Sequence, residues 1–213
     1  MTDRARAAAA AAGVLGLTVA WVTAGLATDG FDPVRQSISQ LQRDGTATGM
    51  VMTVAFAGFS AGALAVSPVL GQRVGRAPQV ALVVAAVATL GAALAPLGQV
   101  RGGRQDVLHL VFGTSGYLSL SVLPLLAGRA LVGRPRGVSY ALGALASGCL
   151  LGTIPADAVS GALQRAGFLA GHAWLLGFAV SVLRSPAPVS GKSAPARGNV
   201  PRGRRRRRPS SPR

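Results

Sequence analysis

The chain carries little charge, and very little of that charge is acidic. Only 13% of its 213 residues are charged, with 6 acidic against 22 basic side chains, whereas 50% are apolar. Globular domains that fold in water carry about 25% charged residues, so this scarcity indicates a chain that folds in lipid. Lys192 is the only lysine, a bias towards arginine that is typical of GC-rich bacterial genomes.

Residues that carry thiol or metal chemistry are also scarce. Cys149 is the single cysteine and lies in an apolar run, which excludes an intrachain disulfide and a cysteine-based zinc site. The two histidines, His109 and His172, form neither a His-Glu-x2-His element nor a His-x3-His pair. We therefore predict no cofactor, and any enzymatic hypothesis rests on residue type alone.

Six stretches of the chain are long and apolar enough to cross a bilayer. The hydrocarbon core is about 30 Å thick and takes roughly 20 residues of helix. Because backbone groups in lipid must be paired within their own segment, each stretch is predicted to be a helix. The predicted spans are residues 7–27, 49–70, 80–97, 107–127, 138–155 and 166–183. The predicted fold is all-α, a polytopic integral membrane helix bundle of six transmembrane helices over residues 1–184.

The distribution of charge along the chain predicts its orientation. If the spans alternate in direction, 17 of the 22 basic residues fall on the side that holds both termini, and five of the six acidic residues fall on the other side. Basic loop residues concentrate on the cytoplasmic side of a membrane. Both termini are therefore predicted to be cytoplasmic, which requires an even number of spans, and the protein is expected in the plasma membrane.

Residues 185–213 are predicted to form a disordered, arginine-rich cytoplasmic tail. The segment has no apolar periodicity, so it cannot bury enough surface to offset chain entropy. We expect its basic run either to contact the anionic headgroups of membrane lipids or to fix the topology as solvated charge. No specific nucleic acid is predicted as a partner, because the tail offers no aromatic or folded surface to bind one. The run consists of Arg204, Arg205, Arg206, Arg207 and Arg208.

The longest connection, between residues 28 and 48, is predicted to carry structure on the outer side. Phe31, Val34, Ile38 and Leu41 recur at helical spacing. An Asp-Pro pair of the kind that begins a helix stands at residues 32 and 33. We therefore predict a short amphipathic helix over residues 33–43 that lies at the outer membrane interface.

Polar residues near the outer ends of the predicted spans form a candidate site. Asp106 and His109 lie three residues apart at the start of the fourth span and so share one helix face. His172 lies about two turns into the sixth span, where an ionisable side chain usually faces the bundle interior or a wet cavity. The predicted extracytoplasmic cluster is Asp32, Ser37, Ser39, Asp106, His109, Asp157 and His172.

Five of the seven members of this cluster also have a plain structural explanation. Asp32 and the two serines can cap and solvate the short interfacial helix. His109 can be a hydrated interfacial side chain, and His172 a hydrogen-bonded packing residue. A metal site is a further alternative, with His109, His172 and Asp157 as its candidate ligands, although their spacing is not diagnostic.

The loop after the first span resembles the signature loop of a family of bacterial and archaeal multi-pass membrane proteins, the domain-of-unknown-function family numbered 998. The matching residues are Asp32, Ile38-Ser39-x-Leu41, Leu108-His109 and Gln164-Arg165. The resemblance extends over residues 7–184 and implies the fold but no activity. The family tends to have a glutamate where this chain has Gln164, so the resemblance gives no support for acid–base chemistry at that position.

Three functions remain open at this point. The first is a protein that binds a lipid or a partner at its extracytoplasmic face, the second is a small-solute transporter, and the third is a metal-dependent membrane hydrolase. A polar cluster open only to the outer leaflet would favour binding, and a continuous polar path between the leaflets would favour transport. Convergence of both histidines with an aspartate would favour the hydrolase.

Overall fold

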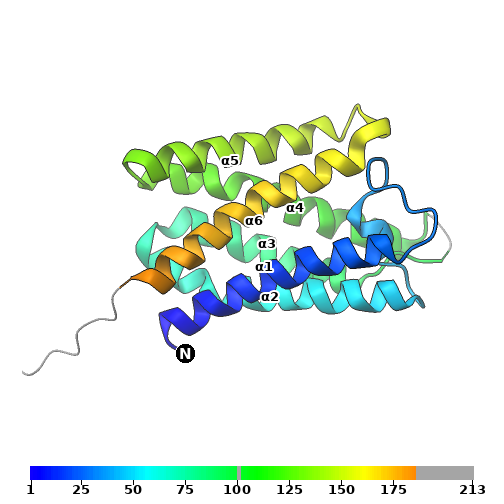
Figure 1. The fold of residues 1–213 in the computed structure, drawn as a ribbon, viewed down its shortest axis with the longest axis horizontal. Coiled ribbons are helices and arrows are strands. Elements are labelled where there is room, and N and C mark those ends of the chain that lie inside the picture. Colours follow the sequence, from blue (N-terminus) through cyan, green and yellow to red (C-terminus); the bar gives the residue numbers. More distant parts are fainter. Residues whose placement is uncertain (100–101, 186–213) are drawn as a thin grey trace, which may run out of the picture.

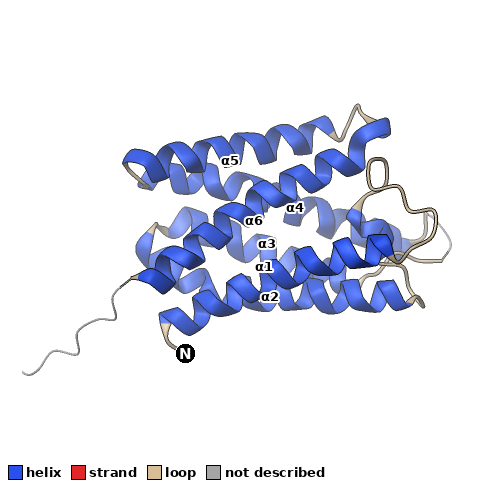
Figure 2. Ribbon diagram, viewed as in Figure 1, coloured by secondary structure: helices blue, strands red, loops and turns tan. Residues whose placement is uncertain are grey.

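The computed structural model describes residues 1–99 and 102–185 as a bundle of helices (Figure 1). Every regular element in this part of the chain is helical (Figure 2). The predicted all-α membrane bundle is therefore confirmed. The predicted tail from residue 186 onwards, including the basic run 204–208, lies outside the described residues. The elements are α1 (Asp3–Leu26), η1 (Ile38–Leu41), α2 (Ala47–Arg73), α3 (Arg76–Leu94), α4 (Arg104–Ala130), α5 (Gly133–Gly152), η2 (Asp157–Val159) and α6 (Ser160–Arg184).

Each of the six predicted apolar stretches overlaps one long helix, although those predicted over residues 80–97 and 138–155 run three residues past the ends of α3 and α5. The helices α1, α2, α3 and α4, and the segment Asp157–Arg184 that contains α6, are long and apolar enough to cross a bilayer. The helix α5 is not among these five, and its first turn carries Arg134 and Arg136. A membrane-spanning bundle is thus established, and the count of six spans stays a prediction.

The long helices form a ring in chain order. Each packs against the next, and α6 closes the ring by packing against α1 while also contacting α4 (Figure 1). The closest approach between α1 and α2 depends on glycine. A Cβ atom on Gly62 would lie 2.5 Å from the Ala9 carbonyl oxygen, and one on Gly13 would lie 2.9 Å from the Gly58 carbonyl oxygen. Small residues at these positions let the two backbones pack directly.

One end of the bundle, which we call the basic end, collects arginine side chains from all six long helices and lies at the left of Figure 1. Arg4 donates to the Ser185 carbonyl at 2.7 Å, and Arg73 donates to the Ser185 hydroxyl at 2.9 Å. Arg73 also lies 3.7 Å from the Asp3 carboxylate. The arginines of this end are Arg4, Arg6, Arg73, Arg76, Arg129, Arg134, Arg136 and Arg184.

The interior of the basic half is filled by apolar side chains. Their exposed fractions are all 0%, so this half is tightly packed, although Ser67, Ser121 and Ser139 are also buried within it. The apolar residues are Val66, Val69, Leu70, Leu82, Leu123, Leu175 and Val182.

The opposite end, the loop end, departs from the prediction in its first loop. The expected amphipathic helix over residues 33–43 is wrong, because residues 33–36 form a turn and only Ile38–Leu41 are helical, as a single 3-10 turn. Ile38 and Leu41 are buried at 4% and 1% exposure and so pack inside the bundle. The physical reason is that the turn gives its carbonyl groups to α6, which pulls the loop over the end of the bundle.

Candidate functional site

Arg165 of α6 fastens the first loop to the bundle. Its Nη1 atom donates to the carbonyl oxygens of Pro33 at 2.6 Å and Gln36 at 2.7 Å, and to that of Gly161 in its own helix at 3.0 Å. Hydrogen bonds from a charged donor are among the strong ones in proteins. The turn at residues 33–36 is therefore tied to α6 by a side chain more than a hundred residues away in the sequence.

The guanidinium of Arg165 is also held between two aromatic rings. Its Cζ atom lies 5.5 Å from the centroid of the Trp21 ring and 5.3 Å from that of the Phe31 ring, and the residue is only 8% exposed. Cation–π contacts of this kind stabilise a cation that has lost its water. Trp21 of α1 is thereby fixed beside the first loop.

The first turn of α6 completes the attachment. The Ala162 amide donates to the Val34 carbonyl at 2.9 Å, and the Ser160 hydroxyl donates to the Arg35 carbonyl at 3.0 Å. Gly161 lies so close to the turn that a Cβ atom there would overlap the Gln36 carbonyl oxygen. The docking of loop on helix therefore requires glycine at this position.

The other end of η1 is held by Gln42, which is fully buried. Its amide nitrogen donates to the Thr53 hydroxyl at 3.0 Å and to the Ala93 carbonyl at 3.1 Å. The backbone beside it pairs with the connection between α3 and α4, where the Leu97 amide donates to the Gln42 carbonyl at 2.9 Å. With both its ends fixed, η1 forms a roof over the interior of the loop end.

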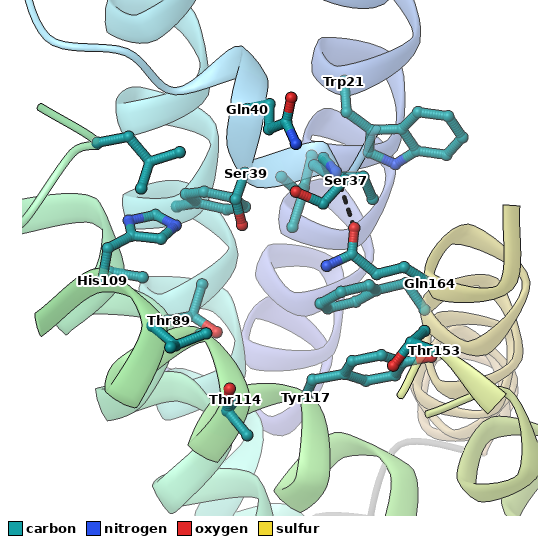
Figure 3. Close-up of a pocket in the computed structure, with 18 of the residues that line it drawn as sticks. Trp21, Ser37, Ser39, Gln40, Thr89, His109, Thr114, Tyr117, Thr153 and Gln164 are labelled. Carbon is teal, nitrogen blue, oxygen red and sulfur yellow. Dashed lines mark hydrogen bonds between the residues drawn. The ribbon is translucent and has the colours of Figure 1, made fainter. Parts of the chain in front are cut away.

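A cavity of about 380 Å³ lies under this roof, and all six long helices contribute to its lining (Figure 3). The apolar lining residues are Leu17, Trp21, Ile38, Phe56, Phe59, Ala92, Leu97, Leu110, Gly113, Leu150 and Phe168. The polar lining residues are Ser37, Ser39, Gln40, Thr89, Asp106, His109, Thr114, Tyr117, Thr153, Ser160, Gln164 and His172.

His109 is a wall residue of the cavity with a defined orientation. It is 3% exposed, so the alternative of a hydrated interfacial histidine is wrong. Its Nδ1 atom lies 2.8 Å from the Ala95 carbonyl oxygen, which can only accept, so Nδ1 carries the proton. The Nε2 atom points towards the middle of the cavity (Figure 3). The two carboxylate oxygens of Asp106, one turn earlier, accept hydrogen bonds from the amides of Gly98 at 2.9 Å and Gly102 at 2.8 Å.

His172 lies deeper and is 3% exposed. Its ring centroid lies 5.2 Å from that of Phe59 and 5.8 Å from that of Phe168, and Phe168 in turn stacks on Tyr117 at 4.6 Å. Neither ring nitrogen of His172 has a hydrogen-bond partner among the described residues, and the same holds for Nε1 of Trp21. The expected hydrogen-bonded packing role is therefore incomplete, because a buried polar group without a partner costs free energy, about 1–3 kcal/mol.

The cavity reaches the surface along α4. Leu110 lines it and is 67% exposed, and Thr114 on the next turn of the same face is also exposed. The other lip of this mouth is formed by Leu150 and Thr153 at the end of α5. The mouth therefore opens sideways from the bundle, between two helices, while η1 covers the top.

The structure brings part of the predicted cluster together. Five of its members line the cavity, namely Ser37, Ser39, Asp106, His109 and His172. Asp32 does not line it, since its carboxylate accepts from the Val34 amide at 2.9 Å and caps the turn. Asp157 is exposed at the start of η2.

Several lining residues were missed by the sequence prediction. Thr89, Thr114 and Gln164 supply polar groups to the cavity, and Trp21 supplies an aromatic wall. Polar side chains inside otherwise apolar helices were the signal that could have indicated the two threonines. Nothing in the sequence of α1 distinguishes Trp21 from a lipid-facing tryptophan.

Two patterns associated with hydrolases have no catalytic geometry. Gly58-Phe59-Ser60-Ala61-Gly62 has the spacing of a nucleophile elbow, yet it lies inside the uninterrupted helix α2. The Ser60 hydroxyl is buried and donates to the Phe56 carbonyl at 2.8 Å. Among the described residues no group of three or more His, Cys, Asp or Glu side chains could hold a metal ion, and the proposed ligand Asp157 lies away from the two histidines' cavity.

Comparison with known proteins agrees with the resemblance in the first loop. The family model described as "Protein of unknown function (DUF998)" matches residues 10–181, which is most of the chain and includes the ring of helices and the cavity. No curated protein and no solved structure matches the chain.

Proposed function

The chain belongs to the DUF998 family of proteins of unknown function, and we propose that it binds a membrane-resident amphiphile in the cavity under η1. The observation that carries this proposal is the shape of the site. The roof is fixed and polar, the walls are largely aromatic and aliphatic, and the mouth lies beside the exposed Leu110 of α4, on the flank of the bundle that we expect to face lipid. A molecule dissolved in the bilayer can enter such a site without crossing water.

The polarity of the lining supports an amphiphile over a purely apolar ligand. Ser37, which precedes η1, and Ser39 of η1 place hydroxyl groups at the top, and Gln164 faces them from α6 (Figure 3). Phe56 and Phe59 of α2 supply apolar surface below. Ligand sites in proteins commonly combine apolar walls with a few polar groups that fix the orientation of the ligand.

The alternative functions gain less support from the geometry. A transporter exposes its site to the two sides of the membrane in turn, and the fully buried apolar side chains of the basic half, such as Leu123 and Leu175, offer no polar groups towards the second side. A metal-dependent hydrolase requires converging ligands, and the described residues do not supply three of them together.

The orientation that we propose places the basic end in the cytoplasm and the cavity in the outer half of a plasma membrane. The gathering of eight arginines from six helices at one end supports it, because such residues are retained on the cytoplasmic side. The tail then follows on the cytoplasmic side, where we expect Arg204–Arg208 to meet anionic lipid headgroups, each contributing about 1 kcal/mol near the surface.

A bulky side chain introduced at the mouth of the cavity tests the proposal. A Cβ atom at Gly113 of α4 or at Gly16 of α1 would meet no other atom within 4 Å, so a side chain can start at either position without overlapping a neighbour. Only Gly113 lines the cavity. We expect Gly113→Phe to lower the occupancy of bound amphiphile about tenfold, corresponding to about 1.4 kcal/mol, and Gly16→Phe to leave it unchanged.

The measurement is native mass spectrometry of the detergent-purified full chain, with the released molecules identified. Thermal unfolding of both variants verifies that each is folded. Equal amounts of bound amphiphile in the parent, Gly113→Phe and Gly16→Phe proteins would contradict the proposed function.

A further inference from the structure

The charge of the cavity restricts what it can bind. No lysine or arginine lines it within the described part of the chain, and its one carboxylate, that of Asp106, already accepts two backbone amide hydrogens. A charged headgroup placed inside would have no counter-charge, and burying an unpaired charge is strongly unfavourable. The part of the ligand that enters the cavity is therefore uncharged.

Two polar side chains face each other across the cavity with opposite hydrogen-bonding character (Figure 3). On α4, Nδ1 of His109 donates to the Ala95 carbonyl, so the neutral ring offers Nε2 as an acceptor. On α6, the oxygen of the Gln164 amide accepts from the Ile38 amide at 2.8 Å, so the nitrogen of that amide is left as a donor. A ligand that satisfies both must donate at one end and accept at the other. A hydroxyl group at each end meets this requirement.

The walls between these two groups suit a flat ring. The rings of Phe59, Phe168 and Tyr117 lie together on one side, with centroid separations of 4.6 to 5.8 Å along the chain of contacts through His172. Flat aromatic ligands pack on such surfaces with offset or edge-to-face geometry. Trp21 and His172 also line this space, and the His172 ring lies between those of Phe59 and Phe168 in the chain of contacts.

The size of the cavity and the position of its mouth restrict the ligand further. A volume of about 380 Å³ is at the small end of ligand pockets and accommodates a ring system better than a complete diacyl lipid. A long apolar chain attached to that ring can leave sideways past Gly113 and Leu150 into the bilayer.

We propose that the ligand is the quinol form of an isoprenoid quinone, with one ring hydroxyl donating to His109 Nε2 and the other accepting from the Gln164 amide nitrogen. This assignment rests on the proposed function and names its ligand class. The oxidised quinone has two acceptors and no donor, so it would leave the acceptor of His109 unpaired. The site therefore prefers the reduced form.

Trp21 gives a direct readout, because it lines the cavity whereas Trp174 bonds to Ser139 at 2.8 Å elsewhere in the bundle. In a Trp174→Phe background, Trp21 is the only tryptophan. We expect anaerobic titration with menaquinol-4 to quench its fluorescence saturably, with an affinity about tenfold higher than that for menaquinone-4. The same titration on the parent chain verifies that the background substitution has no effect.

Two substitutions separate the roles of the facing groups. His109→Leu removes the acceptor, and should abolish the preference for menaquinol-4 while leaving the affinity for menaquinone-4 unchanged. Gln164→Glu keeps the oxygen that bonds to Ile38 but replaces the donor nitrogen with an acceptor. It should therefore weaken the binding of menaquinone-4 more than the binding of menaquinol-4. Gly113→Phe should weaken the binding of both about tenfold, and Gly16→Phe should not.

Equal affinities for the two redox forms in the parent protein, or quenching that never saturates, would overturn the quinol assignment. If phospholipid is released by Gly113→Phe while menaquinol-4 does not bind, the assignment fails and the proposed function stands. If Gly113→Phe changes neither bound lipid nor quinol, both fail.

Discussion

Arg165 shows how much of the loop end depends on one side chain. The planar guanidinium combines three carbonyl contacts at one nitrogen with two aromatic faces, those of Trp21 and Phe31. Lysine carries the same charge but has no planar group that can lie against the two rings. The geometry at this position is therefore more important than the charge.

We expect Arg165→Lys to lower the thermal unfolding midpoint in detergent by about 5–10 °C. The estimate takes about 1.5–3 kcal/mol for a hydrogen bond from a charged donor and about 2–4 °C per kcal/mol for a chain of this length. The matched control is Arg35→Lys, because the Arg35 side chain is 72% exposed and pairs with Asp32 only at 3.7 Å. That exposed pair is worth about 0–1 kcal/mol, so its loss should barely move the midpoint. Equal shifts in the two variants would show that Arg165 acts only as a charge.

Single site residues were predictable from the sequence where a polar side chain interrupts a stretch that is otherwise apolar enough to span a membrane. His109 and His172 stand out as ionisable groups in apolar helices, and both line the cavity. Trp21 and Gln164 could not be assigned a place in the site from the helices that carry them. Their roles depend on which helices become neighbours, and one sequence does not specify that arrangement.

At the scale of elements, the long helices were predictable and η1 was not. The apolar stretch predicted over residues 49–70 lies inside α2, since the thickness of a bilayer sets the length of such a run. The periodicity of residues 33–43 favoured a helix, but the carbonyls of Pro33 and Gln36 instead accept hydrogen bonds from Arg165. The periodicity of a short segment cannot reveal a hydrogen-bond donor that lies more than a hundred residues away in the sequence.

The attachment of the first loop to α6 can be tested with two glycines of the same helix. A Cβ atom at Gly161 would overlap the Gln36 carbonyl oxygen, whereas one at Gly177 would meet no atom within 4 Å. We expect Gly161→Ala to displace the roof, to lower the unfolding midpoint by several degrees and to reduce ligand occupancy. Gly177→Ala should be neutral or stabilising by up to about 1 kcal/mol, because alanine is the better helix former.

The measurement for this pair is thermal unfolding together with native mass spectrometry. A Gly161→Ala protein with parental stability and parental occupancy would show that the roof tolerates a shift of the loop, and the close packing of residues 33–36 on α6 would then have no functional consequence.

At the scale of the whole molecule, the asymmetry between the two ends links fold to function. The basic end is packed and carries arginines from every long helix, and the loop end holds the cavity and its polar roof. Since charge sets orientation and the roof sets access, the same asymmetry that inserts the protein in one direction also places the mouth in one leaflet. The ring order of the helices, which creates the cavity, could not be predicted from charge or hydropathy.

The orientation of the protein in the membrane can be tested with reporter fusions. A reporter enzyme that is active only outside the cytoplasm should be silent when fused after Arg213 and active when inserted at Asp44, which is exposed in the first loop. Insertion at the exposed Asp157 should also give activity if α5 crosses the membrane, because that residue follows α5 at the loop end. Activity at Asp44 combined with silence at Asp157 would mean that α5 does not cross as predicted. Activity after Arg213 with silence at Asp44 would reverse the molecule, and the cavity would then face the inner leaflet, although its chemistry would be unchanged.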